Sequence, residues 1–172
     1  MKVLPHEEAL DKKCHLTNTG VLDGLSREQI TDLEFMGVYM EYHEELVVAD
    51  AQTLEYFFYI IKGRFEVSKI DPDTSKKCLL ATIGKGESFG EMSFLTGTSA
   101  SADVFARQEV IAWAIPHESL RQFIKTHPGG VCLSLNIATL LAQRIQDGNK
   151  RLLEMNSMLK RVLWGYRPSK TP

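Results

Sequence analysis

Between residues 37 and 115 the chain is divided into short apolar stretches, and this pattern constrains its fold more than any other feature. In several stretches apolar and polar residues alternate, as in a strand with one buried face. Glycines or polar turns separate them, and Ile70–Ser75 has the composition of a hairpin turn. The pattern predicts an antiparallel β-sandwich or barrel. The predicted strands are Gly37–Tyr42, Glu45–Val48, Tyr56–Ile61, Arg64–Lys69, Cys78–Ile83, Ser101–Phe105 and Val110–Ile115.

Helices are predicted on both sides of the strand-rich region. Ser26 and Gln29 have the spacing of a capping box, so we expect a helix over residues 26–36. Residues 118–125 carry a short amphipathic pattern that ends at His127-Pro128. From residue 131 to about 163 apolar residues recur with a helical period, which predicts one long C-terminal helix.

The long helical pattern also has the heptad spacing of a coiled coil. Its a and d positions are apolar side chains except at Gly148. Asp147-Gly148-Asn149 could form a turn that divides the helix, but we expect a continuous one. The early positions could pack on the β-domain of the same chain, while the later ones pair with a second chain. The positions are Ala138, Leu141, Ile145, Gly148, Leu152, Met155, Leu159 and Val162.

The composition excludes several classes of protein. With 44% hydrophobic residues and a net charge of −2, the chain is neither disordered nor globally basic. Three widely spaced cysteines and five histidines outside metal-binding motifs predict no disulfide framework and no metal site. We find no catalytic motif, secretory signal or membrane span, so we expect a non-enzymatic, cytoplasmic protein with no membrane partner.

The segment over residues 84–104, GKGESFGEMSFLTGTSASADV, carries the clearest functional signal. Phe89-Gly90-Glu91 suggests a tight backbone turn that leaves amides exposed beside a fixed carboxylate. Such amides can hold a small anion, and a carboxylate can accept a hydrogen bond from a hydroxyl group. The turn therefore suggests a site for a small ligand that carries both groups.

Over about residues 22–164 the sequence resembles the cyclic-nucleotide-binding domain family, which includes the catabolite activator protein and kinase regulatory subunits. The resemblance implies a β-roll flanked by helices, with a C-terminal helix that covers the pocket and, in the activator branch, dimerises. It rests on the matching segments Leu25–Glu28, Phe57–Gly63, Gly86–Glu91, Trp113–Pro116 and Leu141–Ile145.

The phosphate-binding cassette of this family implies a role for each matching residue. Gly90 and Glu91 match, and the family glutamate holds the ribose 2′-hydroxyl. The arginine that neutralises the cyclic phosphate falls at Ala100, and Asp103 stands where a hydroxyl residue is common. Losing a charge-assisted hydrogen bond costs about 1.5–3 kcal/mol, so the resemblance implies impaired cyclic nucleotide binding. The implied pocket positions are Phe89, Gly90, Glu91, Met92, Ser93, Ser99, Ala100, Ser101 and Ala102.

Another cation could replace the missing arginine. In the activator branch an arginine on the C-terminal helix pairs with the cassette glutamate, and Arg144 falls at that position. Arg64 and Lys85 are further candidates. Glu91 could equally form a purely structural ion pair with Arg144. Farther along the helix, Gly148 replaces the threonine that contacts adenine in the activator branch, and Gly148 and Asn149 belong to the implied lid.

The predicted fold class is therefore mainly β with flanking helices (α+β), a jelly-roll-like antiparallel β-roll with a long C-terminal helix. We expect residues 1–21 to be a loose lead-in and residues 22–129 to form the β-roll with its flanking helices. Residues 130–164 are expected to form the lid and dimerisation helix, and residues 165–172 a flexible tail.

The predicted function is that of a regulatory binding module that dimerises and signals through a protein partner, without a resident cofactor. Two alternatives remain: a genuine cyclic nucleotide or atypical nucleotide sensor that uses a substitute cation, and a ligand-free dimeric scaffold. The basic C-terminal end has no recognition helix behind it, so we expect no DNA binding. The expected dimer seam is Leu141, Ile145, Leu152, Met155, Leu159 and Val162.

Overall fold

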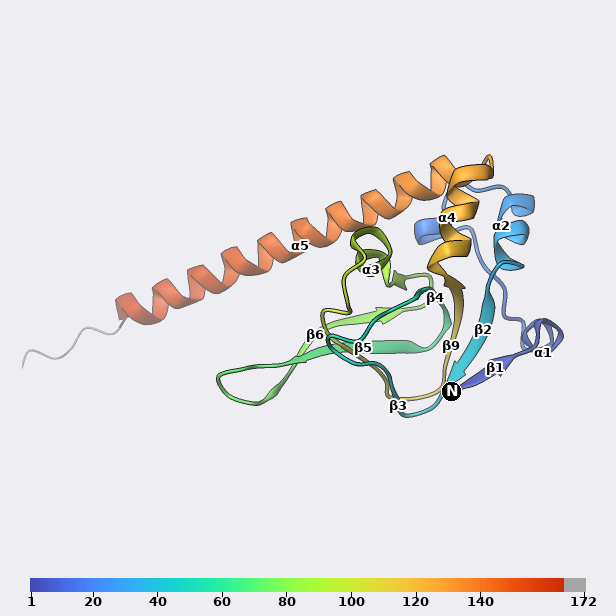
Figure 1. Ribbon diagram of the computed structural model, residues 1–172. Helices are drawn as coiled ribbons and strands as arrows, with labels where there is room; N and C mark the ends of the chain where they lie inside the picture. The colour runs from blue at the N-terminus through green and yellow to red at the C-terminus, as the bar shows by residue number, and fades with distance from the viewer. Residues whose placement is uncertain (166–172) are drawn as a thin grey trace, which may run out of the picture. The chain divides into compact units, whose positions relative to one another are not determined.

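The computed structural model describes residues 1–165, which divide into a compact unit over residues 1–136 and a second unit that begins at Ile137. The first unit contains two antiparallel sheets (Figure 1). The five-stranded sheet has the order β1-β2-β9-β4-β7, and the four-stranded sheet has the order β3-β8-β5-β6. The strands are β1 (Lys2–Leu4), β2 (Val38–Tyr42), β3 (Glu45–Val48), β4 (Tyr56–Lys62), β5 (Arg64–Ile70), β6 (Lys77–Gly84), β7 (Ser88–Phe89), β8 (Asp103–Ala106) and β9 (Val110–Pro116).

Short helices flank the sheets, and a long helix forms the described part of the second unit. The predicted capping box begins α2: the Gln29 N–H donates to Ser26 Oγ at 3.2 Å, and the Ser26 N–H donates to Gln29 Oε1 at 2.9 Å. α4 ends just before His127 and Pro128, as the sequence predicts. The helices are α1 (His6–Asp11), the 3-10 helix η1 (Gly20–Leu22), α2 (Arg27–Glu34), α3 (Glu91–Thr96), α4 (His117–Thr126) and α5 (Gly130–Gly165).

Aromatic rings join the two sheets in the core. Phe89, on β7, stacks on Phe58 of β4 with 4.5 Å between ring centroids. The same ring meets Phe65 of the other sheet in an edge-on contact at 5.5 Å. Each such ring buries about 150–250 Å² and offset or edge-on pairs add attraction beyond the buried area. The packing of the Phe89 ring therefore adds to the short pairing of β7 with β4 in holding this strand.

The predicted fold class is confirmed, and each predicted strand has a counterpart within a few residues. Two elements that the sequence did not predict are β7 and α3, which lie on either side of Gly90. Both are short, so neither produces a periodic pattern long enough to recognise. They flank the turn at Phe89-Gly90-Glu91, which we call the cassette turn.

The expectation of a loose lead-in over residues 1–21 is wrong. β1 pairs with β2, with Val3 opposite Met40, and α1 follows directly. Leu4 and Ala9 are fully buried, which fixes this segment against the first unit. The sequence does not reveal β1 and α1 because each buries only one side chain, Leu4 and Ala9 respectively, which leaves no periodic pattern.

α5 is continuous through Gly148, which confirms that Asp147-Gly148-Asn149 is not a turn. The predicted flexible tail over residues 165–172 lies outside the described residues except for Gly165, the last residue of α5. Within residues 1–165, no helix combines the length and the hydrophobicity that crossing a bilayer requires.

Candidate functional site

The cassette turn is shaped by Gly90. Its φ is +94°, and a Cβ there would lie 2.6 Å from the carbonyl oxygen of Tyr56. Residues with a side chain rarely adopt this backbone conformation, and the close approach to β4 leaves no room for a Cβ at this position. Phe89 anchors the turn on one side, and Glu91 begins α3 on the other. The turn therefore brings the backbone of residues 89–91 against β4.

Glu91 and Ser93 point into the protein, whereas Met92 between them is exposed. Glu91 is only 3% exposed, so its side chain is enclosed by protein groups rather than by solvent. α3 is also held at its far end, because Arg121 of α4 donates to the carbonyl oxygen of Phe94 at 3.0 Å. The same guanidinium lies over the Phe94 ring, 5.2 Å from its centroid.

The second half of the cassette follows Gly97, which ends α3. Ala100 is locked by two backbone bonds of 2.8 Å: its N–H donates to the Gln52 carbonyl, and its own carbonyl accepts from the Ala51 N–H. Ala100 is half-buried and packs against the core between the sheets. Ala102 is buried too, whereas Ser99 and Ser101 are exposed. The position that the family gives to arginine thus carries a methyl group beside the core.

Charged groups near this segment bind the backbone. Asp103 accepts a hydrogen bond from the Asp50 N–H at 2.9 Å, so its carboxylate fixes the turn at residues 50–51. Lys69 donates to the Ser101 carbonyl at 3.0 Å, and its ammonium lies 3.4 Å from the Asp50 carboxylate. The sequence did not point to Lys69 or Asp50, because their roles depend on β5 and β8 being neighbours.

The structure brings the cassette residues 89–102 together in the first unit. Arg144, Gly148 and Asn149 lie on α5 in the second unit, so their roles at the pocket stay predictions. Lys85 lines a different cavity, of about 260 Å³, together with Lys62 and residues of the N-terminal segment. A larger cavity, of about 640 Å³, lies between α1 and α2 and includes none of the cassette residues. Within residues 1–165 no cluster of His, Cys, Asp or Glu is arranged to hold a metal ion.

His117 packs against Phe94 on α3. It is 9% exposed and meets the Phe94 ring edge-on at 5.5 Å. Its Nε2 has no hydrogen-bond partner within residues 1–165. Burial, reinforced by the nearby Arg121 guanidinium, lowers the pKa of His117 below its ordinary value. The shift favours the neutral form of the His117 ring.

Comparison with known proteins identifies this arrangement. Residues 41–127 match the family model of the cyclic nucleotide-binding domain, which covers half of the chain. The chain belongs to this family, and the matched residues lie within the first unit. The match includes the whole cassette and excludes β1, α1 and α2.

Similar proteins place this domain in different contexts. Glutaminase 2 of Bradyrhizobium diazoefficiens is 27% identical over 140 residues, which cover 80% of this chain but only 22% of that protein. The Thermus thermophilus catabolite activator protein has a TM-score of 0.72 at 21% identity, over 87% of this chain and 74% of that one. A mutant regulatory subunit of a cAMP-independent protein kinase A from Trypanosoma brucei has a TM-score of 0.63 at 21% identity, over 87% of this chain and 50% of that one. At these identities the two structures support the fold alone.

Replacing Gly90 by alanine should destabilise the protein by at least about 2 kcal/mol, because strain at positive φ adds to the clash with Tyr56. Gly97→Ala is the matched control, since Gly97 also has a positive φ (+69°) but has open space around its Cβ. It should cost about 1 kcal/mol. Urea unfolding measures both, and equal costs would contradict the role of the close approach.

The depressed pKa of His117 predicts a pH-dependent stability. In acid the unfolded chain binds a proton more readily than the folded one, so the free energy of unfolding should fall as the pH drops below about 6.5. His117→Phe keeps a ring beside Phe94 and should flatten this decrease. His15→Gln, at an exposed histidine, should retain it. Urea midpoints between neutral and mildly acidic pH measure the effect, and an unchanged slope in His117→Phe would refute the assignment.

Proposed function

We propose that this chain is a non-enzymatic regulatory module whose family-typical cyclic nucleotide binding is impaired or absent, and which dimerises and acts through a protein partner. The observation that carries the proposal is the methyl group of Ala100 at the place of the phosphate-binding arginine. A buried anion without a counter-charge costs several kcal/mol, which the remaining ribose contact at Glu91 does not offset.

The geometry around Ala100 supports this proposal. The backbone of Ala100 is bonded on both sides to residues 51–52, so this part of the chain is set by the fold rather than by a ligand. Lys69 reaches the backbone of the same segment, but its ammonium is shared between a carbonyl and the Asp50 carboxylate. Its charge is thus already partly balanced.

One relative supports the view that an arginine decides ligand binding in such a pocket. The Trypanosoma brucei subunit belongs to a cAMP-independent kinase, and the structure of its triple mutant, in which one substitution introduces an arginine, has cAMP in the A site. We infer that an arginine at position 100 of this chain would have a comparable effect, provided that the rest of the pocket is open.

Ala100→Arg should therefore create affinity for cyclic nucleotides. Restoring a charge-assisted bond should strengthen binding by about ten- to 150-fold. Thermal-shift titrations with cyclic AMP and cyclic GMP measure this change, because a ligand at 100 times its dissociation constant stabilises the native state by about 2.7 kcal/mol. Thr98→Arg is the matched control, since it adds the same charge at an exposed position of the same loop that is not one of the implied pocket positions.

The outcomes separate the three functional hypotheses. A wild-type shift that saturates below about 100 µM would contradict impaired binding and favour a sensor with a substitute cation such as Arg144. A thermal shift in Ala100→Arg but not in the wild-type chain supports a regulatory module whose cyclic nucleotide binding is impaired. No thermal shift in either protein would mean that the pocket is closed, and would favour a protein-binding module without nucleotide affinity or a ligand-free scaffold.

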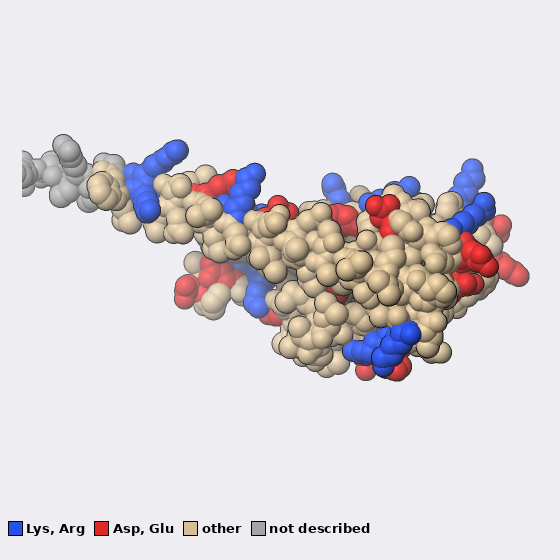
Figure 2. Space-filling model, turned by 90° about the horizontal axis from the view of Figure 1, so that it is seen from above, with Lys and Arg blue, Asp and Glu red and all other residues tan. Residues whose placement is uncertain are grey.

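The apolar surface of α5 supports dimerisation. From Ile145 onward the apolar side chains of the heptad seam are exposed, and Figure 2 shows uncharged residues over much of the face of α5 between scattered charges. Further large apolar side chains outside the seam are exposed as well, so the available surface is wider than the heptad positions. These are Leu153, Met158, Leu163 and Trp164.

Leu152→Glu combined with Leu159→Glu should convert a dimer into a monomer, because the two carboxylates would face their counterparts across an apolar seam. Ser157→Glu, at an outward heptad position, is the control and should leave the dimer intact. Sedimentation equilibrium measures the mass of each variant. A wild-type chain that stays monomeric at about 100 µM would refute the proposed seam.

A further inference from the structure

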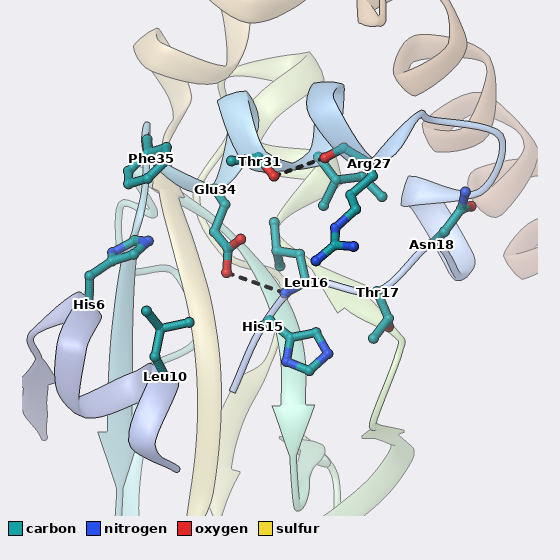
Figure 3. Close-up of a pocket in the computed structure, with 11 residues that line it drawn as sticks. His6, Leu10, His15, Leu16, Thr17, Asn18, Arg27, Thr31, Glu34 and Phe35 are labelled. Atoms are coloured by element: carbon teal, nitrogen blue, oxygen red, sulfur yellow. Dashed lines mark hydrogen bonds between the residues drawn. The ribbon is translucent and has the colours of Figure 1, made fainter. Parts of the chain in front are cut away.

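A cleft of about 640 Å³ lies between α1, the loop at residues 15–18 and α2 (Figure 3). Its volume falls within the range of about 300–1,000 Å³ that is typical of small-molecule sites. All of its lining residues precede residue 41, so the cleft lies outside the part of the chain that matches the cyclic nucleotide-binding domain. It exists because β1 pairs with β2 and places α1 opposite α2.

A half-buried carboxylate forms one side of this cleft. Glu34 accepts hydrogen bonds from the Leu16 N–H, at 3.4 Å, and from the Tyr39 hydroxyl. Both bonds are made to Oε1, and Oε2 has no hydrogen-bond partner within residues 1–165. Burial raises the pKa of Glu34, and the Leu16 N–H and the nearby His6 and His15 rings oppose this shift. A cationic hydrogen-bond donor at Oε2 would compensate the charge of this carboxylate.

A cation lies on the same face of α2. Arg27 and Glu34 are seven residues apart, which is two helical turns, so both can project into the cleft. Figure 3 shows the Arg27 guanidinium reaching towards Leu16 and Thr17. Arg27 forms no ion pair within the described part of the chain, and in particular none with Glu34. The cleft thus offers a positive and a negative group that do not neutralise each other.

Apolar side chains complete the lining. Phe35 is 70% exposed and Leu10 is 60% exposed, and both border the cleft. His6 stacks on Phe35 with 5.1 Å between ring centroids and contacts Tyr39 edge-on, so one face of the Phe35 ring is already covered. The other surfaces remain available to the apolar body of a ligand.

We propose that this cleft binds a small zwitterion of the amino-acid class with an apolar side chain. Its ammonium group would bond to Glu34 Oε2, its carboxylate would meet Arg27, and its side chain would pack on Phe35 and Leu10. A simple anion is disfavoured because it would leave the half-buried Glu34 carboxylate without a partner. A simple amine would make no use of the exposed Arg27 guanidinium, which a ligand carboxylate can reach.

Calorimetric titration with L-phenylalanine and L-leucine up to about 10 mM tests the proposal. Phenethylamine, which lacks the carboxylate, and 3-phenylpropionate, which lacks the ammonium group, separate the two ends of the ligand. The wild-type chain should bind at least one of the amino acids saturably, and more tightly than it binds either truncated compound.

Glu34→Gln should weaken amino-acid binding by about ten- to 100-fold and leave 3-phenylpropionate binding unchanged. Its amide oxygen can still accept from Leu16 and Tyr39, and the melting temperature without ligand checks that the fold is kept. Arg27→Gln, at an exposed position, should weaken amino-acid binding and leave phenethylamine binding unchanged. Glu28→Gln, on α2 but outside the cleft, should change neither.

Absence of saturable binding of both amino acids to the wild-type chain would overturn the proposal. So would equal affinities in the wild-type chain and Glu34→Gln. If phenethylamine bound as tightly as L-phenylalanine and Arg27→Gln had no effect, the zwitterion would be refuted in favour of an amine.

Discussion

The contact on which the cassette depends is the packing of Phe89 between Phe58 and Phe65. β7 has only two residues and pairs with β4, and backbone bonds of Gly86 and Glu87 to Ile60 extend this attachment. The ring of Phe89 adds a contact that joins the two sheets. Because Gly90 has no side chain, its backbone can lie against β4, and the chain then turns Glu91 inward. The position of the carboxylate thus follows from the apolar contact of Phe89, two residues earlier.

The charged side chains beside the cassette bind the protein's own groups. Asp103 accepts from the Asp50 N–H, and Lys69 donates to the Ser101 carbonyl and pairs with the Asp50 carboxylate. Each of these contacts stabilises the turn at residues 50–51 against residues 99–103. A carboxylate that accepts a backbone N–H is held in place without a cation. The contacts that hold this segment are therefore made within the protein itself.

The sequence predicted the parts of this fold that carry periodic patterns. The seven strands, the capping box at Ser26 and the long α5 each produce a regular signal over enough residues. β7, α3 and β1-α1 did not, because their identity depends on single tertiary contacts of Phe89, Arg121 and Leu4. The cassette was found by resemblance, whereas the Glu34 cleft was not found at all. Its lining comes from separate segments that only the pairing of β1 with β2 brings together.

The cleft and the cassette differ chemically but share one framework. The carbonyl oxygen of Glu34 accepts a hydrogen bond from the Trp113 indole N–H at 3.1 Å, and Trp113 is a fully buried residue of β9. β9 pairs with β4, which in turn pairs with β7 and closes against Gly90. A ligand at either site therefore stabilises the same cooperative unit by mass action. A rise in melting temperature alone cannot assign a ligand to one site, so the assignment must rest on variants of Glu34 and Ala100.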